Sequence, residues 1–288
     1  MNVLVTGSSG QLANDIKKES INYSNLNLFL KDKFELNICN QNSLINFIKS
    51  NNIEAIINCA AYTLVDKAED EYEIANEINF KAVNNLIYVV ELFKIKLIHI
   101  STDYVFDGTS KLPYSENDKT NPMNVYGKTK LKGENLVINS FQDTIVIRTS
   151  WLYSSQGNNF VNKIIDLSSK KNSLDIISDQ IGSPTYAADL ANVCLEILSS
   201  FKFISKKGNL YHYSNEGETS WYDFAKSIVE LNRINCDLNP ISTKEFKSKA
   251  FRPKYSVLNK NKIKADYNLK IPHWKDSLIV CLNKIKKT

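Results

Sequence analysis

A tyrosine and a lysine four residues apart, Tyr126 and Lys130, have a spacing that indicates chemistry. On a helix, two such residues lie on one face about a turn apart. A phenol can give a proton to a carbonyl oxygen, and a nearby ammonium favours that exchange at neutral pH because free tyrosine has a pKa of about 10. The ammonium can also reach the ribose of a nicotinamide cofactor. The pair alone is unspecific, since Lys128 and Lys132 lie in the same segment.

A hydroxyl side chain that follows an apolar run makes this pair more specific. Thr102 lies between Ser101 and Asp103, at the expected end of the fourth strand. Ligands of a parallel sheet bind at the carboxyl ends of its strands, so Thr102 is a candidate to bind a reacting carbonyl. The alternative is a threonine that merely caps a turn. Together with Tyr126 and Lys130, it predicts a ketone reductase.

The first apolar run leads into a glycine turn with a G-x-x-G-x-x-A spacing, formed by Gly7, Gly10 and Ala13. Glycines let the backbone approach a pyrophosphate, and the following helix directs its free N–H groups at that charge. A plain tight turn is the alternative. Because the turn follows the first strand of an alternating pattern, we expect dinucleotide binding. The residues expected to contact the cofactor here are Gly7, Ser9, Gly10, Gln11 and Leu12.

An acid that binds the adenosine ribose is expected near the end of the second strand. Asp32 lies twenty-two residues after Gly10, close to that interval, and Lys31 and Lys33 flank it. The acid favours free ribose hydroxyls, whereas the lysines favour a 2′-phosphate. The sequence thus leaves NADH and NADPH open, with a lean toward NADPH, and a polar turn is the alternative.

The elements that must position these groups alternate in type along the first half of the chain. Short apolar runs, typical of strands buried on both faces, cover residues 2–6, 26–30, 55–58, 97–101 and 144–148. Helix-length segments cover residues 11–19, 42–50, 75–93 and 124–139. This alternation predicts an α/β fold with a Rossmann-type, doubly wound parallel sheet in residues 1–150.

The pattern changes after Trp151. Helical stretches are expected at residues 159–169, 187–199, 221–232 and 276–286, with short strands at 174–177 and 210–213. Prolines punctuate the loops between them. We expect residues 151–288 to form mainly a smaller α+β substrate-binding lobe, with some segments returning to the Rossmann domain.

Composition narrows the class of protein. The 288 residues are 43% hydrophobic and 23% charged, as in globular proteins, and the net charge of +5 falls short of a nucleic-acid footprint. No apolar stretch has the length of a signal peptide core or a membrane span. The cysteines are odd in number and far apart in the sequence, which is typical of reduced thiols. A cytoplasmic location is therefore expected. They are Cys39, Cys59, Cys194, Cys236 and Cys281.

Several long strings resemble the dTDP-4-dehydrorhamnose reductases, which belong to the extended short-chain dehydrogenase/reductase family. They are GSSGQLA at 7–13, NCAAYTLVDKAE at 58–69, STDYVFDG at 101–108, NPMNVYGKTK at 121–130, RTSW at 148–151 and DQIGSPT at 179–185. The likeness runs almost end to end, through YH at 211–212 and TSW at 219–221 to RP at 252–253. Strings of this length make a chance similarity implausible.

The resemblance implies the last step of dTDP-L-rhamnose synthesis, in which NAD(P)H reduces C4 of dTDP-4-dehydro-β-L-rhamnose and Tyr126 donates the proton. Thr102 would hold the carbonyl oxygen, and Lys130 would tune Tyr126 and bind the cofactor ribose. The cofactor site would further include Asn37, Ile38, Ala60, Ala61, Tyr62, Thr63 and Ile100. The sugar nucleotide would contact Thr102, Asp103, Tyr126, Trp151 and Arg252.

Some of these positions have a second interpretation. Trp151 could be core packing, and Arg252 could form a surface salt bridge instead of clamping the diphosphate. Asn37 stands where the family usually has aspartate, although it keeps a hydrogen-bonding group. Some members are linked with Mg²⁺ held by acids at a dimer contact. Asp15 lies in the relevant helix, but Ala188 replaces a partner acid, so no metal site is predicted.

Other functions on this scaffold remain as alternatives, with a monomer or a homodimer in each case. Dehydratases usually carry an Asp-Glu pair after the threonine, whereas Asp103 and Tyr104 follow Thr102 here, which disfavours dehydration. An epimerase would recycle bound NAD⁺ instead of consuming NAD(P)H. A non-catalytic subunit, resembling the regulatory subunit of methionine adenosyltransferase, would not need Tyr126 and Lys130.

Overall fold

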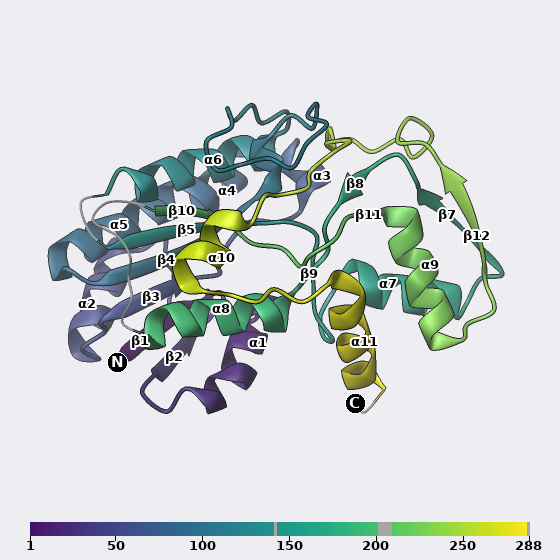
Figure 1. The fold of residues 1–288 in the computed structure, drawn as a ribbon. Helices are drawn as coiled ribbons and strands as arrows, with labels where there is room; N and C mark the ends of the chain where they lie inside the picture. The colour runs from purple at the N-terminus through teal and green to yellow at the C-terminus, as the bar shows by residue number, and fades with distance from the viewer. Residues whose placement is uncertain (141–142, 201–208, 287–288) are drawn as a thin grey trace.

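The computed structural model describes residues 1–140, 143–200 and 209–286 (Figure 1). Within these ranges, six parallel strands form the central sheet, in the order β10-β5-β4-β3-β1-β2. The strands are β1 (Asn2–Thr6), β2 (Asn27–Lys31), β3 (Ala55–Asn58), β4 (Lys96–Thr102), β5 (Thr144–Thr149) and β10 (Asn209–His212). Chain order reverses beside β1, so the carboxyl ends of β1 and β3 border a crevice. The predicted doubly wound sheet is confirmed.

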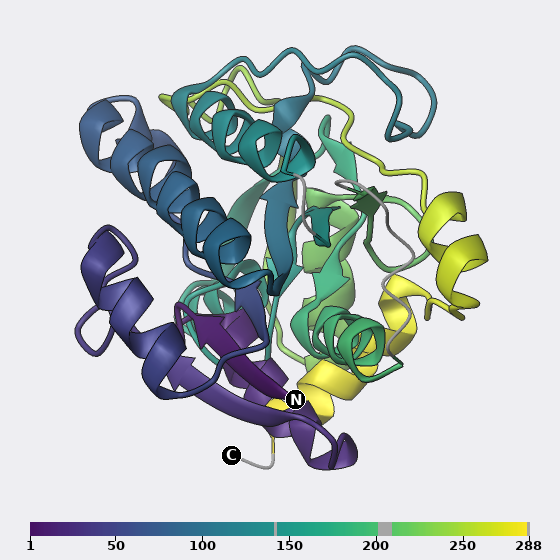
Figure 2. The same cartoon turned by 90° about the vertical axis from the view of Figure 1, so that its left-hand side faces the viewer.

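Alternating side chains on each strand feed two apolar layers. On β1, Val3 and Val5 pack in one buried cluster and Leu4 packs in the other. Figure 2 shows the helices on both sides of the sheet, with blue α5 and teal α6 opposite green α8. Burial on both faces explains why the strands are continuous apolar runs. One layer uses α1 (Gln11–Glu19), α8 (Ala187–Ser199) and α10 (Asn261–Tyr267), and the other uses α2 (Gln41–Ser50), α5 (Ala82–Phe93) and α6 (Val125–Ile138).

A second group of elements, on the right of Figure 1, has its own core around Tyr153, Phe224 and Trp274. Its helices are α7 (Phe160–Ser168), α9 (Trp221–Asn232) and α11 (Trp274–Ile285). Its paired strands are β7 (Ser173–Ile177) with β12 (Asp237–Ile241), β8 (Ile181–Gly182) with β11 (Thr219–Ser220), and β6 (Leu152–Tyr153) with β9 (Thr185–Tyr186). Two elements from the same half of the sequence belong elsewhere, since β10 pairs with β5 and α8 packs on the α1 side of the sheet.

Short elements complete the fold; the first follows α1 and leads into β2, and the others lie in the segments that follow β3 and β4. They are η1 (Ser20–Asn22), α3 (Val65–Ala68), α4 (Tyr72–Asn76), η2 (Glu77–Lys81) and η3 (Asp103–Val105). No helix in the described ranges is both long and apolar enough to cross a bilayer.

The helix predicted at residues 75–93 is present, but it contains a π-helical turn that the sequence did not predict. A π-helical turn, η2, separates α4 from α5. In that turn the Asn79 amide accepts from Tyr62 N (2.9 Å) and donates to Tyr62 O (3.1 Å) and Thr129 Oγ1 (3.2 Å). These tertiary contacts fix the wider turn, and apolar periodicity carries no signal for them.

Candidate active site

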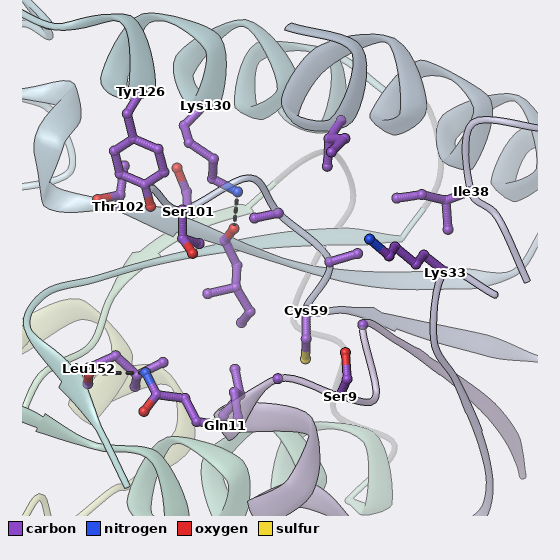
Figure 3. A pocket seen from close by; sticks show the side chains of 18 of the residues that line it. Ser9, Gln11, Lys33, Ile38, Cys59, Ser101, Thr102, Tyr126, Lys130 and Leu152 are labelled. Atoms are coloured by element: carbon purple, nitrogen blue, oxygen red, sulfur yellow. Dashed lines mark hydrogen bonds between the residues drawn. The ribbon is translucent and has the colours of Figure 1, made fainter. Parts of the chain in front are cut away.

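A cavity of about 1160 Å³ opens along the carboxyl ends of the central strands. In Figure 3, Tyr126 and Lys130 on α6 form one side, and Ser9 and Gln11 form the opposite side. The cavity is lined by every predicted site residue except Tyr62 and Arg252. The fold therefore brings nearly all of the predicted cofactor and substrate residues to one place.

The glycine turn lies at one end of this cavity and has no room for side chains. Gly7 has a φ of +68°, and a Cβ there would come within 2.8 Å of the Ala60 backbone. Gly10 N donates to Gly7 O (2.9 Å), and Gly10 precedes α1 without any side-chain cap. The first amides of α1 are thus left to an outside acceptor, as pyrophosphate binding at a helix N-terminus requires. The turn fits a dinucleotide.

The end of β2 combines a turn with a positive charge. Asp32 Oδ1 accepts from Phe34 N (2.8 Å) and Glu35 N (3.0 Å), so the carboxylate fixes the turn while it also lines the cavity. Lys31 pairs with Glu35 at 3.2 Å. Lys33 is exposed at the same rim, so it is the lysine available to a phosphate there.

Thr102 ends β4 and begins η3. Its Oγ1 accepts from Tyr104 N (3.2 Å) and donates to Asp103 Oδ1 (3.1 Å), and the residue is buried. Thr102 therefore caps a turn and also lines the cavity, and its binding of a carbonyl oxygen stays a prediction. Burial raises the pKa of Asp103 to about 6, and the hydrogen bonds from Ser256 and Thr102 partly oppose this rise.

Tyr126 lies in the first turn of α6, where its position is tightly specified. Asn124 Oδ1 caps the helix by accepting from Gly127 N (2.7 Å). A Cβ on Gly127 would come within 2.2 Å of Tyr104 O, so only glycine lets α6 approach η3 this closely. The approach places the phenol beside Thr102 (Figure 3). Burial raises the pKa of Tyr126 to about 12, and the hydrogen bond with Thr102 opposes this rise.

Lys130 points from the next turn of α6 toward β4. Its Nζ donates to Ile100 O at 2.6 Å (Figure 3). Burial lowers the pKa of Lys130 to about 8, and the negative charge of Glu134 opposes that fall. The expected lowering of the Tyr126 pKa by the Lys130 charge stays a prediction. The amine is turned to the strand, and Thr102 is the group that lowers the phenol's pKa.

Trp151 follows β5 with a φ of +49°, which is uncommon for a bulky residue. Its indole stacks on Trp221 with 3.5 Å between ring centroids and 7° between planes. A Cβ on Gly182 would come within 2.5 Å of the same indole. Trp151 thus packs in the second lobe and still lines the cavity.

Two predicted residues lie outside the cavity lining. Tyr62 is buried, and its hydroxyl donates to Glu71, because its ring packs beside Ala68 and Ala75. Arg252 donates to Asp66 from both terminal nitrogens, at 2.7 and 3.2 Å. The ion pair occupies the guanidinium that was expected to clamp a diphosphate, so the alternative salt bridge is what the structure contains.

Two further predicted positions are Asn37, which stands where the family usually has aspartate, and Asp15, in the helix that some members use to bind Mg²⁺. Asn37 lines the cavity, and its Oδ1 accepts from Cys39 N (2.9 Å). Asp15 is buried, accepts from Ser154 Oγ (2.6 Å) and lies 3.7 Å from Lys18 Nζ. Among the described residues, no three acidic, histidine or cysteine side chains form a metal-binding group.

Several lining residues were missed from the sequence. Ser101, Thr149 and Ser150 follow or end predicted strands, so their position at carboxyl ends could have indicated them. Glu77 and Lys81 line the cavity from η2, and no sequence signal exists for a π-helical turn. The polar lining is therefore richer than predicted.

Comparison with known proteins gives the family. A model of the RmlD substrate binding domain matches residues 1–287. A dTDP-4-dehydrorhamnose reductase of Aggregatibacter actinomycetemcomitans is 35% identical over 286 residues, covering 96% of each chain. The crystal structure of a dTDP-4-dehydrorhamnose reductase from Clostridium acetobutylicum has a TM-score of 0.93 and 37% identity, covering 99% of this chain and 100% of that one.

The Bacillus anthracis dTDP-4-dehydrorhamnose reductase, whose crystal structure is a complex with NADP, has a TM-score of 0.91 and 36% identity. The match covers 98% of this chain and 99% of that one. The resemblance predicted from the sequence is confirmed. The chain belongs to the RmlD substrate binding domain family.

Proposed function

We propose that this chain is an NAD(P)H-dependent dTDP-4-dehydrorhamnose reductase. It reduces the C4 ketone of dTDP-4-dehydro-β-L-rhamnose and yields dTDP-L-rhamnose. The observation that carries the proposal is the meeting of Thr102, Tyr126 and Lys130 in one cavity with the glycine turn. Relatives that cover nearly the whole chain carry this name.

In this mechanism the chain supplies the proton and orients the ketone. Thr102 Oγ1 holds the ketone oxygen, and the Tyr126 hydroxyl donates its proton to that oxygen. A phenol whose pKa is raised to about 12 carries its proton at neutral pH, and a cation nearby would bring that pKa closer to the working pH, where proton transfer is most effective. Lys130 lies one helical turn away and offers a cation to the same end of the cavity.

The cofactor would lie between the glycine turn and Lys130. Gly7, Gly10 and the first amides of α1 would hold the pyrophosphate, Asp32 and Lys33 the adenosine ribose, and Lys130 the nicotinamide ribose. The bound cofactor supplies the hydride that adds to C4. Lys33 is exposed on the cavity rim and its ammonium has no carboxylate partner among the ion pairs of the described residues, which supports a preference for NADPH.

The sugar nucleotide would enter from the side of the second lobe. We propose that residues 1–150 mainly bind the cofactor and residues 151–288 mainly bind the substrate. Trp151 offers an apolar plane to the sugar, and its stacking on Trp221 ties that plane to the second lobe. Asp103 lies next to Thr102 and would contact the sugar hydroxyls.

The decisive experiment measures NADPH and NADH oxidation separately with dTDP-4-dehydro-β-L-rhamnose and identifies the product. Stoichiometric cofactor oxidation with formation of dTDP-L-rhamnose is expected. Sugar conversion without net oxidation would indicate an epimerase, and no reaction with either cofactor would indicate a binding subunit. Either outcome would overturn the proposal.

A further inference from the structure

A buried ion pair lies directly behind the proposed reductive site. The Arg148 guanidinium, on β5, donates to Glu134 of α6 through NH2 (2.5 Å) and Nε (3.0 Å). The exposed fractions of the two side chains are 3% and 1%. Burying two charges costs several kcal/mol per ion, which close pairing only partly offsets. Because burial of this pair costs free energy, we looked for a function that it serves.

Further hydrogen bonds hold the Arg148 side of the pair in place. Arg148 NH1 lies 3.2 Å from His212 Nε2, and His212 Nδ1 lies 3.0 Å from Tyr114 O. Burial lowers the pKa of His212 to about 3, so the ring is neutral. Its Nδ1 then donates to Tyr114 O, and its Nε2 accepts from Arg148. Arg148 therefore donates in two directions, to Glu134 and through His212 to Tyr114 O, which fixes the guanidinium that holds the Glu134 carboxylate.

Glu134 also reaches the segment that carries the proposed site. Its Oε2 accepts from Ser101 Oγ at 2.7 Å, and Ser101 immediately precedes Thr102. One turn earlier on α6, Lys130 Nζ donates to Ile100 O. Two neighbouring bridges therefore join α6 to the end of β4, and the three candidate groups lie on these two segments.

We propose that Glu134 is a positioning residue for this site, which holds Ser101 and Thr102 against α6 and places a carboxylate one helical turn from Lys130. The inference deepens the proposed function and rests on it for its catalytic meaning.

The groups that face Lys130 come from three elements, and Glu134 is the charged one among them. Cys59 follows β3, and burial raises its pKa, so it remains a thiol. His99 on β4 remains neutral because burial lowers its pKa. Tyr126 on α6 keeps its proton. Among the described residues that face Lys130, Glu134 carries the negative charge that opposes the effect of burial on the ammonium.

The test titrates Lys130 itself in protein without cofactor, by trace acetylation with acetic anhydride across pH and mass spectrometry of its peptide. We expect the wild type to titrate near pH 8, and Glu134→Gln to titrate about one pH unit lower because the carboxylate is lost. Glu134→Asp retains the charge and should restore the wild-type midpoint. Identical midpoints in wild type and Glu134→Gln would overturn the proposal.

Glu134→Gln leaves Arg148 buried without its counterion and could therefore fail to fold. A second variant keeps the test valid in that case. Glu134→Gln/Arg148→Gln removes both charges and is expected to fold, with a midpoint between those of Glu134→Gln and the wild type because a neighbouring positive charge is lost as well. Asp189→Asn is the matched control, since that carboxylate accepts from Asn215 and Ser277 on other elements. It should titrate as the wild type does. A folded double variant whose midpoint lies above the wild-type value would also overturn the proposal.

The same variants are then assayed for turnover as a function of pH. In the wild type, kcat should fall as Lys130 loses its proton above about pH 8, and in Glu134→Gln this fall should begin about one unit earlier. A purely structural role would lower kcat equally at all pH values, which would contradict the inference. A wild type without reductase activity would instead refute the proposed function. The acetylation experiment would still test whether Glu134 sets the pKa of Lys130, because it needs no turnover.

Discussion

Tyr126 has the properties of a proton donor because of its surroundings at the start of α6. Burial holds its pKa near 12, and Thr102 lies beside its hydroxyl. Tyr126→Phe removes only the proton that is to be transferred, so we expect kcat to fall by about 10²- to 10⁴-fold. NADPH affinity, measured by fluorescence titration, should be nearly unchanged. Wild-type turnover in this variant would refute the proposed mechanism.

Lys33 is the residue that should set the choice of cofactor. It lies exposed on the cavity rim beside Asp32, whereas Lys31 is paired with Glu35. We expect Lys33→Ala to raise the KM for NADPH by about tenfold, since it removes one charge-assisted contact to a 2′-phosphate. The KM for NADH should change little. Lys31→Ala is the matched control, and equal losses for both cofactors would argue against this role.

At the scale of elements, the site depends on how closely α6 approaches its neighbours. Gly127 lies against η3 and Gly133 lies against η2, and a Cβ on Gly133 would come within 2.1 Å of Asn79 O. The same π-helical turn holds the Tyr62 backbone through the Asn79 amide. Helix α6 is thus fixed on two sides, and the angle at which Tyr126 and Lys130 enter the cavity follows from that packing.

Gly133→Ala tests this dependence. The added methyl group must push α6 from η2, so we expect the free energy of unfolding to fall by about 1–3 kcal/mol, as for other overpacked sites. Turnover should fall with it, because Tyr126 and Lys130 move together with the helix. Urea denaturation and kcat measure the two effects. Lys128→Ala, at an exposed position on the same helix, should change neither.

At the scale of the molecule, a buried carboxylate joins the sheet layer to the second lobe. Asp15 on α1 accepts from Ser154, which follows β6. Burial raises the pKa of Asp15, so the folded state holds this proton to higher pH than the unfolded chain does. The stability that depends on the group is then greatest below the unfolded pKa of about 4 and declines as the pH rises through the raised folded value.

Asp15→Asn removes that ionisation and keeps an acceptor for Ser154. We expect its melting temperature at pH 7 to equal or exceed that of the wild type, by about 2 °C at most. The difference should disappear below about pH 4, where Asp15 is protonated in both states. Thermal unfolding across pH measures this. A Mg²⁺-dependent rise of the wild-type melting temperature that the variant lacks would contradict this purely structural account and indicate a metal site.

The sequence by itself determined the order of the elements and the identity of the central reactive groups. Apolar runs at residues 2–6 and 55–58 became β1 and β3 without change of bounds, because burial on both faces leaves a direct mark in composition. The glycine turn followed β1 as predicted, since a close backbone approach admits only glycine. Tyr126 and Lys130 share one helix, so their spacing alone placed them together.

Only the tertiary structure decided where the longer side chains point. Arg252 pairs with Asp66 and Tyr62 with Glu71, although both were expected to reach ligands. The Glu134–Arg148 pair joins α6 to β5, and neither residue had a local pattern that indicated the other. A strand or helix pattern specifies which face is buried. The partner of a polar side chain depends instead on which distant segment packs against it, and that is settled when the layers come together.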